Sequence, residues 1–194
     1  MQPPAEHVHW MFATGFLLLG LLLLAEGIVG REVWRRRTWR AYLWPSLFFG
    51  LGVLMWPVMV FFTNSTIHML AHSSWAQVMM AAGAAELGLV SGKLKNELWK
   101  LAVPGMFAVS GAAFLIHEAN PWFFSRSAFV HHVCGWTLLV GALFPLGAAF
   151  KPRSFVFNTG YALVIVVIAV VLYTSRDVSP IFGHLDPSAG VAHR

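Results

Sequence analysis

Long apolar runs alternate with short polar segments along the whole chain. Six runs of roughly 20 residues hold few charges, and each is bounded by charged residues, by proline or by a cluster of Asn, Ser and Thr. A helix needs about 20 apolar residues to cross the hydrocarbon core of a bilayer. The pattern predicts transmembrane helices at Trp10–Val29, Ala41–Phe62, Ile67–Val90, Leu98–His117, Ala128–Phe150 and Ser154–Thr174. The predicted fold class is all-α, a polytopic integral membrane protein built as a six-transmembrane-helix bundle.

The third of these runs is the most polar. It holds His72, Ser73, Ser74, Gln77 and Glu86. Because polar side chains are costly in lipid, this helix is expected to be shielded by its neighbours. The loops are too short for a second domain, so the predicted organisation is an outer segment 1–9, a helical domain 10–174 and an outer tail 175–194.

The charged residues support a membrane protein and predict its orientation. Only 11% of the residues are charged, whereas a soluble domain carries roughly 25%. Ten basic residues lie in predicted loops on one side of the bilayer, and three lie on the other. The ten are Arg31, Arg35, Arg36, Arg37, Arg40, Lys93, Lys95, Lys100, Lys151 and Arg153, and the three are Arg126, Arg176 and Arg194. Cytoplasmic loops are enriched in Lys and Arg, so both termini are predicted to face the periplasmic side of a bacterial inner (plasma) membrane. The basic loops would contact membrane lipid, and no nucleic-acid partner is expected.

All nine histidines fall on this predicted outer side. Five of them, together with one carboxylate, are close to helix ends: His68, His72, His117, Glu118, His131 and His132. His68 and His72 are four residues apart and therefore share one helical face. Neutral imidazole is a common ligand of copper, zinc and iron. The sequence therefore predicts a transition-metal site near the outer face, with His68, His72, His117, His131 and His132 as its metal ligands.

Copper is the favoured metal, ahead of zinc and iron. Only one carboxylate, Glu118, lies among the histidines, which argues against a carboxylate-rich di-iron centre. Glu118 is the candidate catalytic base or bridging ligand. The single Cys134 excludes an internal disulfide and a Cys-based metal cage within the chain. The alternative in which the histidines lie among lipid headgroups, as amphipathic side chains do, stays open.

A single b-type haem is the alternative cofactor. Its two axial ligands would be His72 with His131 or His132, and Arg126 would bind the propionates. Gly83, Gly111 and Gly135 are the small residues against which the macrocycle would lie. Such a haem could exchange electrons with a quinone or a periplasmic redox partner.

Glu86 is placed deeper in the third predicted helix. It is on the same helical stripe as His72 and about 21 Å from it at 1.5 Å per residue. A carboxylate at that depth is expected to be protonated, paired or hydrated. It is a candidate catalytic or transport residue that passes protons or cations to the metal, or else a purely structural hydrogen-bonding group. For Glu26, five residues before Arg31, the structural interpretation is preferred.

Three functions follow from these patterns. The first is a metalloprotein for redox chemistry or metal handling, either a metal-dependent oxidoreductase or a carrier. The second is a cytochrome-b-like anchor with one haem near the outer face. The third is a non-catalytic accessory subunit of a membrane complex. Small residues such as those at Gly15 and Gly20 permit close helix approach, inside the chain or with other membrane subunits or a second copy.

Overall fold

The computed structural model describes residues 4–62, 66–117 and 126–176, and all of the regular structure in these ranges is helical. The helices are α1 (Ala5–Val29), α2 (Arg31–Arg35), α3 (Thr38–Ala41), α4 (Leu43–Phe62), α5 (Thr66–Val90), the 3-10 helix η1 (Glu97–Leu101), α6 (Ala102–His117), α7 (Arg126–Gly141), α8 (Leu143–Phe150) and α9 (Phe155–Tyr173). The side chains of residues 59–69, 71 and 117 are outside the description.

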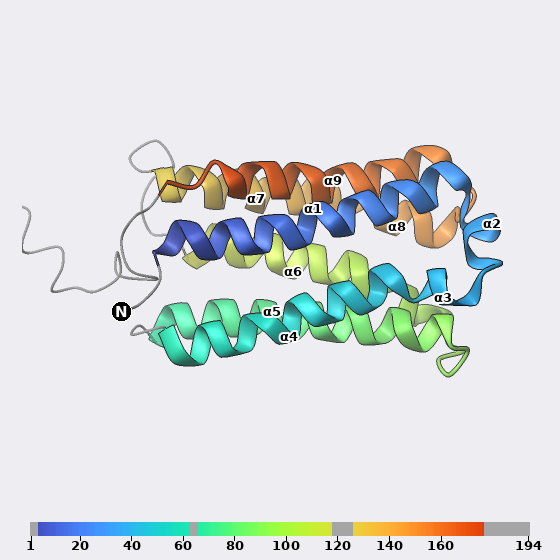
Figure 1. Cartoon of the computed structure of the whole chain (residues 1–194), viewed down its shortest axis with the longest axis horizontal. Coiled ribbons are helices and arrows are strands. Elements are labelled where there is room, and N and C mark those ends of the chain that lie inside the picture. Colours follow the sequence, from blue (N-terminus) through green and yellow to red (C-terminus); the bar gives the residue numbers. More distant parts are fainter. Residues whose placement is uncertain (1–3, 63–65, 118–125, 177–194) are drawn as a thin grey trace, which may run out of the picture.

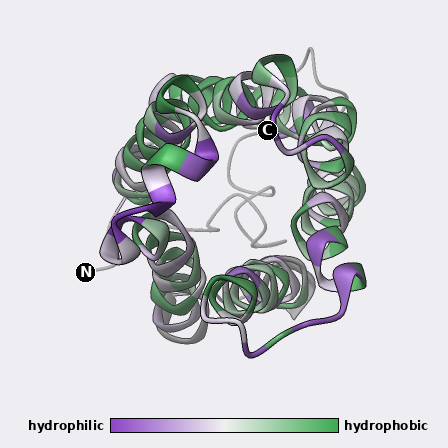
Figure 2. Ribbon diagram, turned by 90° about the vertical axis from the view of Figure 1, so that its right-hand side faces the viewer, coloured by the Kyte–Doolittle hydropathy of each residue, from purple (hydrophilic) through white to green (hydrophobic). Residues whose placement is uncertain are grey.

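The long helices lie side by side (Figure 1), and the view along the bundle shows them arranged in a ring (Figure 2). Following the contacts, α1 packs against α4, α4 against α5, α5 against α6, α6 against α7, and α7 and α8 against α9. The ring closes where α9 packs along α1, the first long helix of the chain. Consecutive long helices run in opposite directions, so α1 begins at the end of the bundle where α9 ends (Figure 1).

The two ends of the bundle differ in chemistry. The end where α1 begins holds His9, His72 and His131 and is named the histidine end. The opposite end holds the short helices α2 and α3 with Arg31 and Arg35, and is named the arginine end. Figure 2 shows the bundle from the arginine end, with hydrophilic segments at the near rim and mostly hydrophobic helices behind them. The ten basic residues assigned to one side of the bilayer all belong to segments at the arginine end.

Five helical segments of the described chain are long and apolar enough to cross a membrane: Ala5–Val29, Thr38–Val58, Glu97–Ile116, Arg126–Phe150 and Phe155–Tyr173. This is the composition expected of a polytopic membrane protein. The helix α5 is as long as α1 but is not among the five, in keeping with its polar residues. It lies between α4 and α6 in the ring. The predicted shielding of its polar residues is confirmed only in part, because His72, Ser73 and Glu86 are buried whereas Ser74 and Gln77 are exposed.

The predicted apolar runs all coincide with helices, but one of them is interrupted. The run Ala128–Phe150 is divided at Ala142 into α7 and α8. Pro145 has no N–H to bond the carbonyl of Gly141, which accounts for the interruption. At the arginine end, Gly30 adopts φ +88° and turns the chain from α1 into α2. A side chain would be strained in this backbone conformation, so glycine suits the position.

Glycines allow neighbouring helices to approach closely. A Cβ atom built on Gly83 of α5 would lie 2.7 Å from the backbone nitrogen of Phe49 in α4. One built on Gly111 of α6 would lie 2.8 Å from the carbonyl oxygen of Gly135 in α7. These three glycines, which the sequence suggested as a surface for a macrocycle, therefore lie in helix–helix contacts, where backbone meets backbone.

Candidate functional site

The α7 histidines are held in a defined orientation by their own helix. His131 is buried, with 4% of its surface exposed. Its Nδ1 lies 2.8 Å from the carbonyl oxygen of Ser127, and Nδ1 of His132 lies 2.9 Å from that of Ala128. A carbonyl oxygen only accepts hydrogen bonds, so Nδ1 carries the proton in both rings and Nε2 carries the lone pair. This arrangement orients metal-binding histidines in many proteins.

His72 of α5 is connected to His131 through two aromatic rings. His72 is 8% exposed, and its ring centre lies 6.4 Å from that of Trp75. Trp75 contacts Phe114 of α6 edge-on at 4.6 Å, and Phe114 lies 5.5 Å from His131. The helices α5, α6 and α7 therefore meet at the histidine end through successive ring contacts in the order His72, Trp75, Phe114 and His131.

His9 also lies next to His131, although it belongs to the segment 1–9 that was predicted to lie outside the helical domain. The helix α1 begins at Ala5 and extends past His9. The His9 ring lies 6.3 Å from the His131 ring, at an interplanar angle of 77°. Its Nδ1 lies 3.0 Å from the hydroxyl of Ser175, a residue that is 3% exposed. A signal was present in the sequence, because His9 is three and seven residues before the buried Phe12 and Phe16 and continues their helical stripe.

The remaining predicted ligands are less completely described. His68 lies in α5 and His117 is the last residue of α6, but their side chains are outside the described part of the structure. Glu118 lies outside the described residues altogether. Among the side chains that are described, no group of three or more His, Cys, Asp or Glu is arranged to hold a metal ion. The described part of the cluster thus contains His9, His72, His131 and His132.

Arg126, the predicted partner of haem propionates, has a structural contact. It is exposed at the first position of α7, and its Nε donates a hydrogen bond to the carbonyl oxygen of Thr174 at 2.9 Å. Thr174 directly follows α9. The interaction therefore links the start of α7 to the end of α9 at the histidine end.

At the arginine end, Glu26 forms an ion-pair cluster with two arginines. Its Oε1 accepts from Nε of Arg31 at 3.2 Å and from Nε of Arg35 at 3.1 Å. The Glu26 side chain is 5% exposed, whereas those of Arg31 and Arg35 are 26% and 29% exposed. The contacts agree with the structural interpretation of Glu26. Burial lowers the pKa of the Arg35 guanidinium, as does the charge of Arg31, while Glu26 opposes this change.

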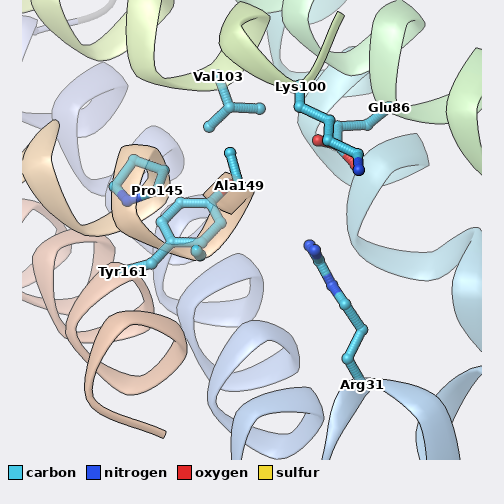
Figure 3. Close-up of a pocket in the computed structure, with 8 residues that line it drawn as sticks. Arg31, Glu86, Lys100, Val103, Pro145, Ala149 and Tyr161 are labelled. Atoms are coloured by element: carbon cyan, nitrogen blue, oxygen red, sulfur yellow. The ribbon is translucent and has the colours of Figure 1, made fainter. Parts of the chain in front are cut away.

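Glu86 is the second buried carboxylate at the arginine end, with 8% exposure. It borders a cavity that is also lined by Arg31, Lys100 and Tyr161, with an apolar wall formed by Val103, Pro145, Ala148 and Ala149 (Figure 3). The charges of Arg31, Arg35 and Lys100 act on its carboxylate. No hydrogen bond or ion pair to Glu86 is present among the described residues, which distinguishes it from Glu26.

Tyr161 and Lys100 were not predicted to be neighbours of Glu86. Tyr161 lies on α9 and Lys100 on η1, far from Glu86 in the sequence. A phenol inside an otherwise apolar run was the available signal for Tyr161, because its hydroxyl needs a partner when buried.

Comparison with protein-family models, with curated proteins and with solved structures finds no match for this chain. Function must therefore be inferred from the residues themselves. The histidine cluster at one end and the buried carboxylates at the other are the two polar features of the bundle that bear on it.

Proposed function

We propose that the protein is an integral membrane metalloprotein that binds a transition-metal ion, with copper favoured, through imidazoles at the histidine end. The observation that carries the proposal is the pairing of His9 with the buried, oriented His131. Two imidazoles that share one ion, with metal–nitrogen bonds of about 2 Å, have ring centres about 5 to 6 Å apart. The ring centres of His9 and His131 are 6.3 Å apart, close to this range.

The orientation of the rings supports binding through Nε2. The Nδ1–H groups of His131 and His132 are directed to main-chain oxygens, so Nε2 is the nitrogen able to bind a metal. The hydroxyl of Ser175 is placed to orient His9 in a similar way. Further ligands would come from His68, His72, His117 or Glu118, which lie on or next to the helices that surround His131.

A nitrogen-rich set with one nearby carboxylate suits copper, and zinc or iron less well. The glycine contacts favour a small ion over the alternative b-type haem, because Gly83, Gly111 and Gly135 pack against neighbouring helices and not beside a space for a macrocycle. We place the histidine end on the periplasmic side, since ten basic residues are at the other end. The function served would be redox chemistry or metal handling at that face, together with a periplasmic redox partner, a quinone or another membrane subunit.

The test is metal binding by purified protein in detergent. The full chain is stripped with chelator, reloaded with copper, zinc or iron, and the bound metal is measured by elemental analysis. The expected result is one equivalent of copper, lost or bound at least tenfold more weakly in His131→Gln and in His9→Gln. The matched control is His7→Gln, because the His7 side chain is 57% exposed on the same helix.

Binding that survives His131→Gln and His9→Gln unchanged would show that the ligands are chosen wrongly. A visible spectrum with and without dithionite identifies the alternative cofactor, since reduced b-type haem has sharp bands near about 560 nm. A protein with neither metal nor haem would instead support the accessory-subunit function.

A further inference from the structure

The cavity beside Glu86 is large enough for water. Its volume is about 30 Å³, and a cavity needs roughly 10 to 15 Å³ to hold one water molecule. Its polar walls come from four parts of the chain that are distant in sequence: Arg31 of α2, Glu86 of α5, Lys100 of η1 and Tyr161 of α9. In Figure 3 the side chains of Arg31 and Lys100 extend toward the space beside Glu86.

Buried polar atoms around this cavity need hydrogen-bond partners. Tyr161 is 5% exposed, and its hydroxyl has no hydrogen bond among the described residues. A buried hydroxyl without a partner destabilises the folded state, so such groups are normally satisfied by protein or by ordered water. A water in the cavity can accept from Tyr161, Arg31 or Lys100 and donate to the Glu86 carboxylate. Both the size and the polarity of the cavity therefore fit a bound water.

The two buried carboxylates at this end have opposite surroundings. Glu26 accepts two guanidinium hydrogen bonds on one oxygen, from Arg31 and from Arg35. Glu86 faces cations only across the cavity, and its carboxylate is free to change protonation without breaking a hydrogen bond to a described residue. When two neighbouring carboxylates have such different environments, the less firmly paired one is the candidate for proton exchange.

The charged and titratable groups that surround Glu86 come from three sides. Glu26, Arg31 and Arg35 lie on the side of α1 and α2, Lys100 lies on η1, and Tyr161 lies on α9. Lys100 also pairs with the exposed Glu97. The helices α4 and α8, and α6 at this depth, contribute no charged or titratable side chain. Proton binding at Glu86 therefore changes the net charge of a cluster that contains nearly equal numbers of acidic and basic side chains.

Access to water is available from the arginine end. The Lys100 side chain is 40% exposed and that of Arg31 is 26% exposed, while the tips of both extend toward the cavity. These two side chains thus connect the cavity to the bundle surface, whereas Tyr161 and the apolar wall close it on the inner side.

We infer that Glu86 is the proton-binding group of a hydrated site that exchanges protons with the aqueous phase at the arginine end. A hydronium ion formed from the cavity water transfers its proton to a carboxylate oxygen of Glu86. One O–H bond of the hydronium breaks, one O–H bond forms on the carboxyl group, and a neutral water remains hydrogen bonded to Tyr161. The site is separate from the histidine cluster and needs no metal for this exchange.

The experiment is infrared difference spectroscopy of the full chain in detergent while the pH is lowered from alkaline to acidic. The expected result is a carbonyl band of a protonated, buried carboxyl group that appears on acidification and moves to lower frequency in D₂O. Glu86→Gln should abolish the band, and Tyr161→Phe should keep it but change its frequency and its pH midpoint. The matched control is Glu32→Gln, because the Glu32 side chain is 71% exposed at the same end; this change should leave the band in place.

A second measurement needs no substitution at Glu86. A hydrophobic carbodiimide reacts with protonated carboxyl groups, so mass spectrometry of the wild-type protein should find Glu86 modified faster at acidic pH. The pH at which the modification rate is half-maximal should equal the midpoint of the infrared titration. The inference is overturned if no protonated-carboxyl band depends on Glu86, or if its modification is absent at every pH. Glu86 would then be a permanently ionised structural partner of Arg31 and Lys100. Both measurements can be made on metal-free protein, so their outcome is independent of the copper assay.

Discussion

Replacing Glu26 by Gln should destabilise the protein far more than the same change at Glu32. Both carboxylates lie at the arginine end and both pair with arginine, but Glu26 is 5% exposed and Glu32 is 71% exposed. Glu26→Gln removes the negative charge from two hydrogen bonds and leaves the more distant Glu86 as the remaining buried carboxylate near Arg31 and Arg35.

The magnitude follows from the burial of the partners. Breaking a buried ion pair costs about 3 to 5 kcal/mol when the remaining charge stays buried. Here the arginine side chains are 26% and 29% exposed and can be partly hydrated, so we expect about 2 to 3 kcal/mol. The exposed pair of Glu32 and Arg153 should contribute about 0 to 1 kcal/mol. For a chain of this size, 1 kcal/mol shifts the melting temperature by roughly 2 to 4 °C.

The assay is thermal unfolding of the two variants in the same detergent, followed by tryptophan fluorescence. Glu26→Gln should lower the melting temperature by about 5 to 10 °C, and Glu32→Gln by about 0 to 3 °C. Equal shifts in the two variants, or a more stable Glu26→Gln protein, would refute the assignment of Glu26 as the counterion that holds α1 to α2.

Three further predictions concern packing, accessibility and metal binding. Gly111→Ala should destabilise the protein by about 1 to 3 kcal/mol, because its Cβ would lie 2.8 Å from a carbonyl oxygen of α7. Gly105→Ala on the same helix meets nothing within 4 Å and should be neutral or slightly stabilising in the same unfolding assay. Cys134 is fully buried and should react with maleimide only after denaturation, as measured by mass spectrometry; rapid labelling of the folded protein would contradict its place in the core. Ser175→Ala should weaken copper binding by roughly tenfold because His9 loses an orienting contact, and an unchanged affinity would remove Ser175 from the proposed site.

The long helices could be predicted from the sequence because a bilayer imposes a minimum length on each apolar run. The expectation that α5 is shielded is confirmed for His72, Ser73 and Glu86, which are buried, but not for the exposed Ser74 and Gln77. The short helices α2 and α3 were not predicted, since they depend on local backbone geometry. The packing of α9 along α1 also depends on how side chains fit across the ring, which no pattern along one helix reveals.

In the candidate sites, contacts between residues close in sequence were predicted, whereas contacts between distant segments were not. Nearness in sequence brought out His131 and His132, and the five-residue spacing indicated the pair Glu26 and Arg31. The contact of His9 with His131 was missed because the first helix begins before its apolar run. The cavity beside Glu86 was missed as well, because its walls come from four segments that meet only in the folded chain.

The packing of α9 against α1 determines which contact of the bundle forms late. During synthesis α1 leaves the ribosome well before α9, so the face of α1 that α9 covers must wait until α9 has been inserted. Contacts between segments so distant in sequence form late and slowly. A chain truncated before α9 would expose that stripe of α1, including the close approach at Gly20, to lipid or to another protein. An unfinished copy would therefore differ from a finished one in the exposure of this surface.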